Sequence, residues 1–385
     1  MATSKIVTSS ITDDAVTSGK IASGVVPTLR PNAKPLIING DMAVAQRDTS
    51  VTGITGDGYK LCDRWYEYLS SLGTYTFTQE AQSIHNPAGG AGFRQAFRID
   101  CTTADASPSA SDEFWFGMKF EGQDLQLIKK GSSNAEKLTL AFWVKSNKTG
   151  TGQVNFRDTD NGRMCSGTYT ISSADTWEHK IINIAADTSG AFTDDYAESL
   201  QIQWYLDSGS NYEGGAAPTA WEADSATDRN ASGTLNIGDN TANDWSITGV
   251  QLEVGEYTSS TLPPFQHETY SDSLTRCHRY YEELANQTYS MVFSCYAVGT
   301  AYLQDSYRAI KRTTPTITFT ATGVGGLRAY AGGSEKTLTN VTSDNRTANA
   351  VSFQINGTSN PFTVGQAGHL NNTSAGGYYT ADAEL

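Results

Sequence analysis

The chain has 385 residues, of which 38% are hydrophobic and 18% charged, with a formal net charge of −14. This length suits about two domains, and so few charges are typical of short strands joined by polar turns rather than of helical or disordered chains. The negative charge excludes a nucleic-acid partner, because phosphate binding needs a basic surface. No stretch approaches the ~20 apolar residues of a membrane span, so membrane insertion is not expected.

Residues 1–35 have an unusual spacing of apolar side chains. These side chains recur every fifth residue, at Ile6, Ile11, Val16, Ile21 and Val26. That period fits neither a helix nor a strand. Burying each side chain yields about 2 kcal/mol, whereas ordering each of the roughly 25 residues that carry them costs ~1–2 kcal/mol. We therefore predict an extended segment that orders only against partner chains; an unstructured tail is the alternative.

Residues 36–270 predict an antiparallel jelly-roll β-sandwich. Turn-bounded apolar runs occur at Arg64–Leu69, Thr74–Gln79, Arg94–Cys101, Glu113–Phe120, Leu138–Ser146, Val154–Arg157, Arg163–Ile171, Glu178–Ile184, Leu200–Leu206 and Asp244–Val254. Many short strands without long helices between them are typical of this architecture. Nearly continuous apolar residues in Thr139–Val144 predict a strand buried on both faces. One short helix is predicted at Gly122–Lys130.

The pattern predicts a linker helix over residues 271–288 and a smaller β domain over residues 289–385. Ser271 can cap the helix. Its apolar stripe is formed by Leu274, Cys277, Tyr281 and Leu284. The strand pattern then returns at Val292–Val298, Thr316–Ala321, Leu327–Ala331, Val351–Ile355 and Pro361–Val364. The expected fold class is mainly β: an extended anchor, a jelly roll, a linker helix and a C-terminal β domain.

No motif indicates catalysis or cofactor binding. The sequence contains no G-x-S-x-G elbow, P-loop or H-E-x-x-H motif. The five cysteines are widely separated, as expected of free thiols in a reducing cytosol, and the first 26 residues lack the apolar core of a signal peptide. Carboxylate pairs such as Asp194-Asp195 would serve a glycosidase only at a separation of ~5–9 Å. We assign no catalytic residue, no metal ligand and no cofactor, and we expect a protein that is not an enzyme.

Aromatic residues divide into candidate core residues and candidate binding residues. Trp65, Trp143, Trp177, Trp204 and Trp245 lie in strand patterns, which predicts core packing. Aromatic rings in loops can instead stack on sugar faces. The candidate glycan contacts are Tyr212, Trp221, Tyr330, His369, Tyr378 and Tyr379. Local packing or a trimer contact is the alternative for these residues.

Two families resemble this chain. Leu36–Met42, Thr139–Ser146, Asp175–Glu178 and Trp245–Glu253 are similar to strands of jelly-roll carbohydrate-binding modules. In that family an acidic residue near the first strand helps to hold a structural calcium ion, but Ala43 stands at that position here. The resemblance therefore implies the sandwich and a sugar ligand, and it assigns no metal.

Across nearly its whole length the chain also resembles bacteriophage tail-fibre and receptor-binding proteins. The similar motifs are Asn39–Arg47, Asp63–Trp65, Thr248–Gly255, Arg276–Glu282, the repeat-like Ile11–Gly24 and the closing Ala381–Leu385. This resemblance implies a homotrimer in the virion, made in the host cytoplasm, attached through its N-terminus to a tail, baseplate or adaptor protein, and touching host-surface polysaccharide at its distal end. A capsid decoration or head-fibre protein is the nearest alternative, and a polysaccharide depolymerase is the enzyme alternative.

Overall fold

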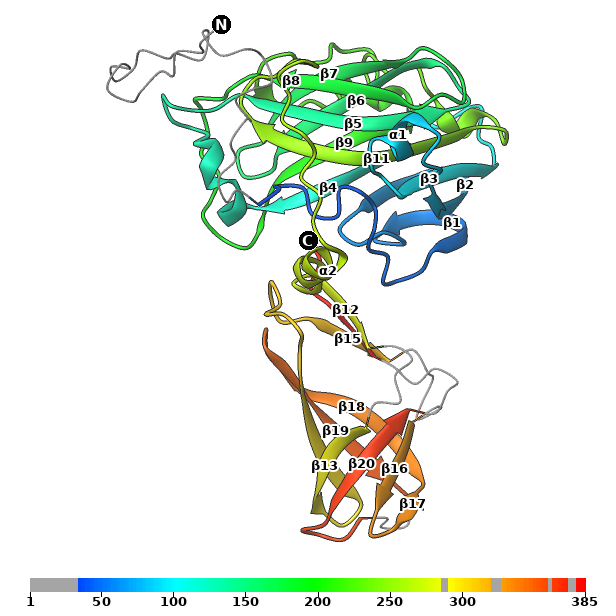
Figure 1. Cartoon of the computed structure of the whole chain (residues 1–385), viewed down its shortest axis with the longest axis vertical. Coiled ribbons are helices and arrows are strands. Elements are labelled where there is room, and N and C mark those ends of the chain that lie inside the picture. Colours follow the sequence, from blue (N-terminus) through cyan, green and yellow to red (C-terminus); the bar gives the residue numbers. More distant parts are fainter. Residues whose placement is uncertain (1–33, 285–289, 320–326, 359–361, 373–378) are drawn as a thin grey trace, which may run out of the picture.

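The computed structural model describes residues 34–284, 290–319, 327–358, 362–372 and 379–385. Within these ranges the fold is mainly β, with antiparallel strands, which confirms the predicted class. A large sandwich occupies one end of the molecule and a smaller curled sheet the other (Figure 1). The five-spaced residues, Ile6 to Val26, lie outside the described residues, so their role in attachment and trimerisation stays a prediction.

The sandwich consists of two sheets joined through one long strand, β2 (Tyr66–Ala81). Its first half pairs with β4 (Glu113–Glu121) and its second half with β3 (Gln95–Thr103). Between the halves, Ser71 and Gly73 have φ angles of 60° and 72°. Strands that switch sheets do so through bends of this kind. The two runs that the sequence predicts in this region are therefore one bent strand.

The first sheet continues from β2 through β4, β9 (Glu198–Ser208), β6 (Gly150–Asp158), β7 (Arg163–Ile171) and β10 (Glu222–Ala223). The second sheet continues from β2 through β3, β11 (Asp244–Val254), β5 (Leu138–Ser146) and β8 (Glu178–Ile184), and β1 (Ser50–Gly58) pairs with β2. The helical segments are short: α1 (Pro87–Gly90) and the 3₁₀ turns at Gly122–Ile128, Ser210–Tyr212, Ala226–Asp228 and Ile237–Asp239. The helix predicted at Gly122–Lys130 is thus a 3₁₀ segment.

Large aromatic rings fill the space between the two sheets. Trp65, Trp204 and Trp245 are fully buried there, and Trp65 stacks on Phe116 at 4.9 Å between ring centroids. Trp177 is also buried, but in a small cluster on the outer side of the second sheet, with Trp143 half-buried beside it. The core prediction is wrong for Trp143, because strand alternation gives the core side of β5 to its neighbours Phe142 and Val144.

The C-terminal part contains two further sheets. A three-stranded sheet has the order β12 (Tyr281–Leu284), β21 (Tyr379–Asp382), β15 (Thr316–Phe319). A seven-stranded sheet has the order β17 (Ser334–Lys336), β16 (Leu327–Ala331), β20 (Ala367–Asn372), β13 (Ser290–Ala297), β14 (Thr300–Ser306), β19 (Ala350–Gly357), β18 (Leu338–Arg346). Phe362–Val364, where a strand was predicted, is not in a strand. The inner faces of these sheets share a core that includes Phe293, Phe353 and Tyr379.

The linker helix is shorter than predicted. Helix α2 spans Tyr270–His278, and its N-cap is Thr269, whose side-chain oxygen accepts from the backbone N–H of Asp272. The residues from Tyr281 form strand β12 instead, because β21 at the far end of the chain pairs with them. The apolar stripe at helical spacing could not reveal this partner, which lies about a hundred residues away in sequence.

A buried joint connects the sandwich to the C-terminal part. We define the joint as Arg47, Arg64, Tyr280, Tyr281 and Glu384. The Arg64 guanidinium lies 3.5 Å from the Tyr280 ring centroid, and that of Arg47 lies 3.6 Å from the Tyr281 ring centroid. Both arginines form ion pairs with Glu384. Four of the motifs that resemble phage fibres supply these five residues, so those motifs mark a structural joint.

Candidate functional site

The structure brings together two of the predicted glycan contacts, Tyr330 and His369. They lie opposite each other on the neighbouring strands β16 and β20. Their rings are stacked, with 5.1 Å between centroids and 15° between planes. His369 is exposed and Tyr330 is half-buried, while their neighbours Ala329 and Leu370 point into the core. The ring pair therefore lies on the solvent side of the sheet.

A tight hairpin places a carboxylate beside this ring pair. Gly332 and Gly333 join β16 to β17 with φ angles of 57° and 79°, which is the two-residue turn that favours glycine. The turn sets Glu335 directly opposite Tyr330. The Tyr330 hydroxyl donates to Glu335 Oε2 at 3.2 Å, and Arg328 Nη1 donates to the same oxygen at 3.3 Å.

The row of side chains continues onto the next strand. Val292 of β13 lies opposite His369 and is 72% exposed. We call Glu335, Tyr330, His369 and Val292, which cross four adjacent strands, the distal row. The hydrogen bond from Arg328 to Tyr330 and the charge of Glu335 raise the pKa of the Arg328 guanidinium, so this cation persists next to the row.

A hollow of about 310 Å³ lies beside the two rings. Its lining includes Tyr330, His369 and the glycines of the turn, together with Gly368. A Cβ atom at Gly368 would lie 2.3 Å from the Phe293 ring and 2.4 Å from the Tyr330 carbonyl oxygen, so only glycine fits there. Gly368 thus lets the Phe293 ring pack closely beneath the sheet, and the two glycines of the turn place no side chain at the hollow.

These groups can bind a polyhydroxylated ring. An aromatic face offers apolar contact to the C–H face of a sugar, and a carboxylate and a guanidinium offer hydrogen bonds to its hydroxyl groups. In the part of the chain that the structure describes, no group of three or more His, Cys, Asp or Glu side chains is placed to hold a metal ion. The distal row itself offers aromatic rings for stacking and polar groups for hydrogen bonds.

The candidates Tyr212 and Trp221 lie far from this surface, on the sandwich. The Trp221 indole N–H donates to the Ala185 carbonyl oxygen at 2.8 Å, and Lys130 Nζ lies 4.9 Å from its ring centroid. Trp221 is half-buried and packs on the main core. Tyr212 is half-buried beside Glu113. The structure does not bring these two residues together with Tyr330.

Tyr379 is a core side chain. It is 3% exposed, its ring packs against Phe353 at 4.8 Å, and its hydroxyl donates to Asp305 at 2.7 Å. Its ring faces are therefore covered by protein, because Tyr379 lies in strand β21 with its side chain on the core side. Tyr378 lies outside the described residues. Sequence reasoning missed Arg328 and Glu335, although the Gly-Gly turn between them is a hairpin signal.

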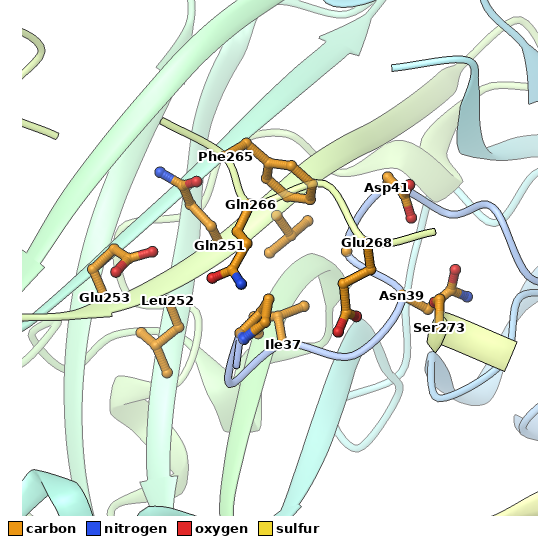
Figure 2. A pocket seen from close by; sticks show the side chains of 13 residues that line it. Ile37, Asn39, Asp41, Gln251, Leu252, Glu253, Phe265, Gln266, Glu268 and Ser273 are labelled. Carbon is orange, nitrogen blue, oxygen red and sulfur yellow. The ribbon is translucent and has the colours of Figure 1, made fainter. Parts of the chain in front are cut away.

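A second hollow, beneath the N-G-D motif, is too small for a sugar. Figure 2 shows Asn39, Asp41, Gln251 and Glu268 around it. Its volume is about 20 Å³, which is near the ~10–15 Å³ needed for one water molecule. Gly40 permits a close approach of two segments here, since a Cβ atom would lie 2.2 Å from the Val250 carbonyl oxygen. This motif thus serves packing.

No protein-family model matches the sequence, and no curated protein matches it. Among solved structures, the chain is similar to tailspike protein 4 of bacteriophage CBA120, at 11% identity and a TM-score of 0.29, over 57% of this chain and 21% of that chain. It is also similar to a putative sugar-binding protein from Bacteroides thetaiotaomicron, at 13% identity and a TM-score of 0.30, over 57% of this chain and 100% of that one.

A third similar structure is a family 11 carbohydrate-binding module from Clostridium thermocellum, at 8% identity and a TM-score of 0.26, over 54% of this chain and 99% of that one. The chain spans about a fifth of the tailspike structure. The two-sheet description of the sandwich rests on strand pairing. None of the helices in the described ranges has the length and apolar character needed to cross a bilayer.

Proposed function

We propose that this chain is a non-catalytic glycan-binding protein and that the distal row is its contact surface. The observation that carries the proposal is the stacked Tyr330–His369 pair, held on the solvent side of a sheet beside Glu335 and Arg328. Aromatic faces flanked by a carboxylate and a guanidinium suit the mixed apolar and hydroxylated surface of a sugar.

In the wider proposal, the chain is a homotrimeric fibre subunit of a bacteriophage virion that is anchored by residues 1–35. Support comes from the fibre-like motifs and from the apolar spacing of five in that segment. Three copies would present three distal rows to a repetitive host polysaccharide. Linked weak contacts of this kind gain overall affinity without any new contact at each site.

The test is binding of purified full-length protein to host-surface polysaccharide. We expect Tyr330→Ala to weaken binding at each site about tenfold, because a lost stacking contact of about 1.4 kcal/mol corresponds to that factor. Tyr196→Ala is a matched control, since this tyrosine is 55% exposed on the sandwich. The measurement is surface plasmon resonance on immobilised polysaccharide.

Two results would contradict the proposal. One is equal binding by the wild type and Tyr330→Ala. The other is a fall in the viscosity of the polysaccharide on incubation with the protein, which would indicate a depolymerase instead. Imaging of labelled protein on particles separates tail attachment from attachment to the head.

A further inference from the structure

A groove crosses the outer side of the second sheet of the sandwich, far from the distal row. Its floor is Trp143 of β5 and His179 of β8, which lie opposite each other and stack with 5.0 Å between ring centroids. His179 is exposed and Trp143 is half-buried. Neither ring is needed to fill the core, because Phe142 and Val144 occupy the core side of β5.

Two crossing segments build the walls of this groove. The segment around α1 supplies Phe93, and the segment after β11 supplies Leu262 and Phe265. The rings of Phe93 and Phe265 meet edge to face at 4.9 Å. The segment around α1 is held to the sheet by Trp177, whose indole N–H donates to Gln82 Oε1 at 3.1 Å. The volume of the groove is about 250 Å³.

A bulge in β11 shapes the groove. The register of β11 against β5 shifts between Thr248 and Gln251. Gly249, within this shift, has a φ angle of 61°, and a Cβ atom there would lie 2.5 Å from the Phe93 ring. Glycine therefore lets the Phe93 ring lie across the strand. Bulges are frequent next to functional sites, where they redirect side chains.

The lining of the groove carries no acidic, lysine or arginine side chain. Partial burial lowers the pKa of His179, so its imidazole is neutral at pH 7. Ser259 and Gln251 supply polar atoms at the rim and the base. The groove thus combines a stacked pair of aromatic rings, apolar walls and few uncharged polar groups. A charged ligand is disfavoured there, because nothing would compensate its desolvation.

The outer side of the first sheet is closed by contrast. The segment 209–233 lies over it and is bonded to buried polar side chains of β6: Gln153 Nε2 donates to the Asp228 carbonyl oxygen at 2.7 Å, and Asn155 Nδ2 donates to the Arg229 carbonyl oxygen at 2.7 Å. These two side chains therefore find hydrogen-bond partners within the chain. On the second sheet, the aromatic floor lies in an open groove.

We propose that the Trp143–His179 groove binds one neutral pyranose ring of a glycan. A pyranose has an apolar C–H face that can pack on an aromatic ring, and hydroxyl groups that can bond to Ser259 and Gln251. The volume lies below the ~300–1,000 Å³ of sites for larger ligands, so a single ring is the fitting unit. This site is independent of the distal row, because its residues belong to a different sheet and a different core.

The test uses saturation-transfer NMR and titration on the full-length protein. The probes are methyl β-D-glucopyranoside and methyl β-D-galactopyranoside, with glucuronate and decaproline as contrasting ligands. We expect at least one neutral glycoside to receive saturation at its ring C–H protons. Trp143→Ala should weaken its binding about tenfold, whereas Tyr330→Ala should leave it unchanged.

A second variant guards against a folding defect in Trp143→Ala, because Trp143 also contacts the Trp177 cluster. Ser259→Trp fills the groove from its exposed rim and leaves the floor intact, so it should abolish binding in a folded protein. The inference fails if neutral glycosides do not bind, if both variants bind as well as the wild type, or if glucuronate or decaproline binds more tightly. If Tyr330→Ala still binds the neutral glycoside but no longer binds host polysaccharide, the groove and the distal row are separate sites.

Discussion

Burial raises the pKa of two aspartate side chains in this protein. Asp207, at the end of β9, accepts the backbone N–H groups of Ser208 and Gly238, both at 2.9 Å. Burial nevertheless raises its pKa to about 7. Beside the joint, burial also raises the pKa of Asp63 to about 6, although the charge of Arg47 lowers it. Such groups hold a proton in the folded chain at a pH where the unfolded chain has lost it.

The pH dependence of stability follows from the raised pKa of Asp207. Between about pH 4, the ordinary aspartate pKa, and about pH 7, the folded state binds a proton that the unfolded state does not. The contribution of Asp207 is therefore fully present below pH 4 and is lost as the pH rises to 7. In Asp207→Asn this loss disappears, so the variant should lose less stability than the wild type between pH 5 and pH 8.

The measurement is urea unfolding of both proteins at pH 5 and pH 8. Asp228→Asn is the control. Asp228 is only half-buried, and its carboxylate accepts from the backbone N–H of Ala216 in a surface loop. A parallel pH dependence for the wild type and Asp207→Asn would show that the buried carboxyl does not titrate in this window.

Among the secondary-structure elements, β21 and the tail that follows it have an unusual role. β21 pairs with both β12 and β15, and the next residues reach the sandwich. The side chains of Arg64 and Glu384 are only 2% and 4% exposed. Arg312 also donates to the carbonyl oxygens of Ala383 and Glu384, both at 2.8 Å. Residues 383 and 384 thus connect the sandwich to the C-terminal part.

Removal of one partner from this buried ion pair should be costly. Glu384→Ala leaves the Arg64 guanidinium buried without its carboxylate, and such a loss destabilises proteins by about 3–5 kcal/mol. The measurement is the free energy of unfolding by urea. Glu256→Ala is the matched control, because its pair with Lys137 is about half exposed and such surface pairs contribute about 0–1 kcal/mol. Equal effects of the two variants would contradict the role of the joint.

The whole molecule is elongated, with the sandwich at one end and the distal row on the sheet at the other end (Figure 1). The buried joint connects the two ends through ion pairs and ring contacts. This arrangement suits the proposed fibre, in which one end is anchored and the other reaches a surface. The proposed trimer adds threefold repetition of both candidate sugar sites.

The proposed trimer is tested through the apolar spacing near the N-terminus. The full chain at micromolar concentration should have three times the 41.4 kDa mass of one chain. Ile11→Asp with Ile21→Asp should lower that mass, because charges at buried positions of an assembly are strongly unfavourable. Ser9→Asp with Ser18→Asp is the matched control, at positions between the apolar ones. Sedimentation equilibrium measures these masses, and a monomeric wild-type chain would contradict the trimer.

Much of the strand content follows from local sequence. The runs Leu138–Ser146, Arg163–Ile171, Glu178–Ile184 and Asp244–Val254 have the same bounds as β5, β7, β8 and β11. Side-chain alternation and polar turns are local properties, so one sequence reveals them. Tyr330 and His369 could likewise be chosen from the sequence as candidate glycan contacts. That their rings stack on each other depends on the order of the strands. That order joins residues far apart in the chain, which no local pattern encodes.

The amino-acid sequence by itself determined that the chain is mainly β, acidic and rich in aromatic residues near polar turns, because these properties depend on composition and short-range periodicity. Tertiary structure alone decided that residues 281–284 pair as a strand, that Trp143 faces a groove, and that Glu384 meets Arg64. The physical reason is the same in each case: the stabilising partner comes from a distant segment, and only folding brings that partner within bonding distance.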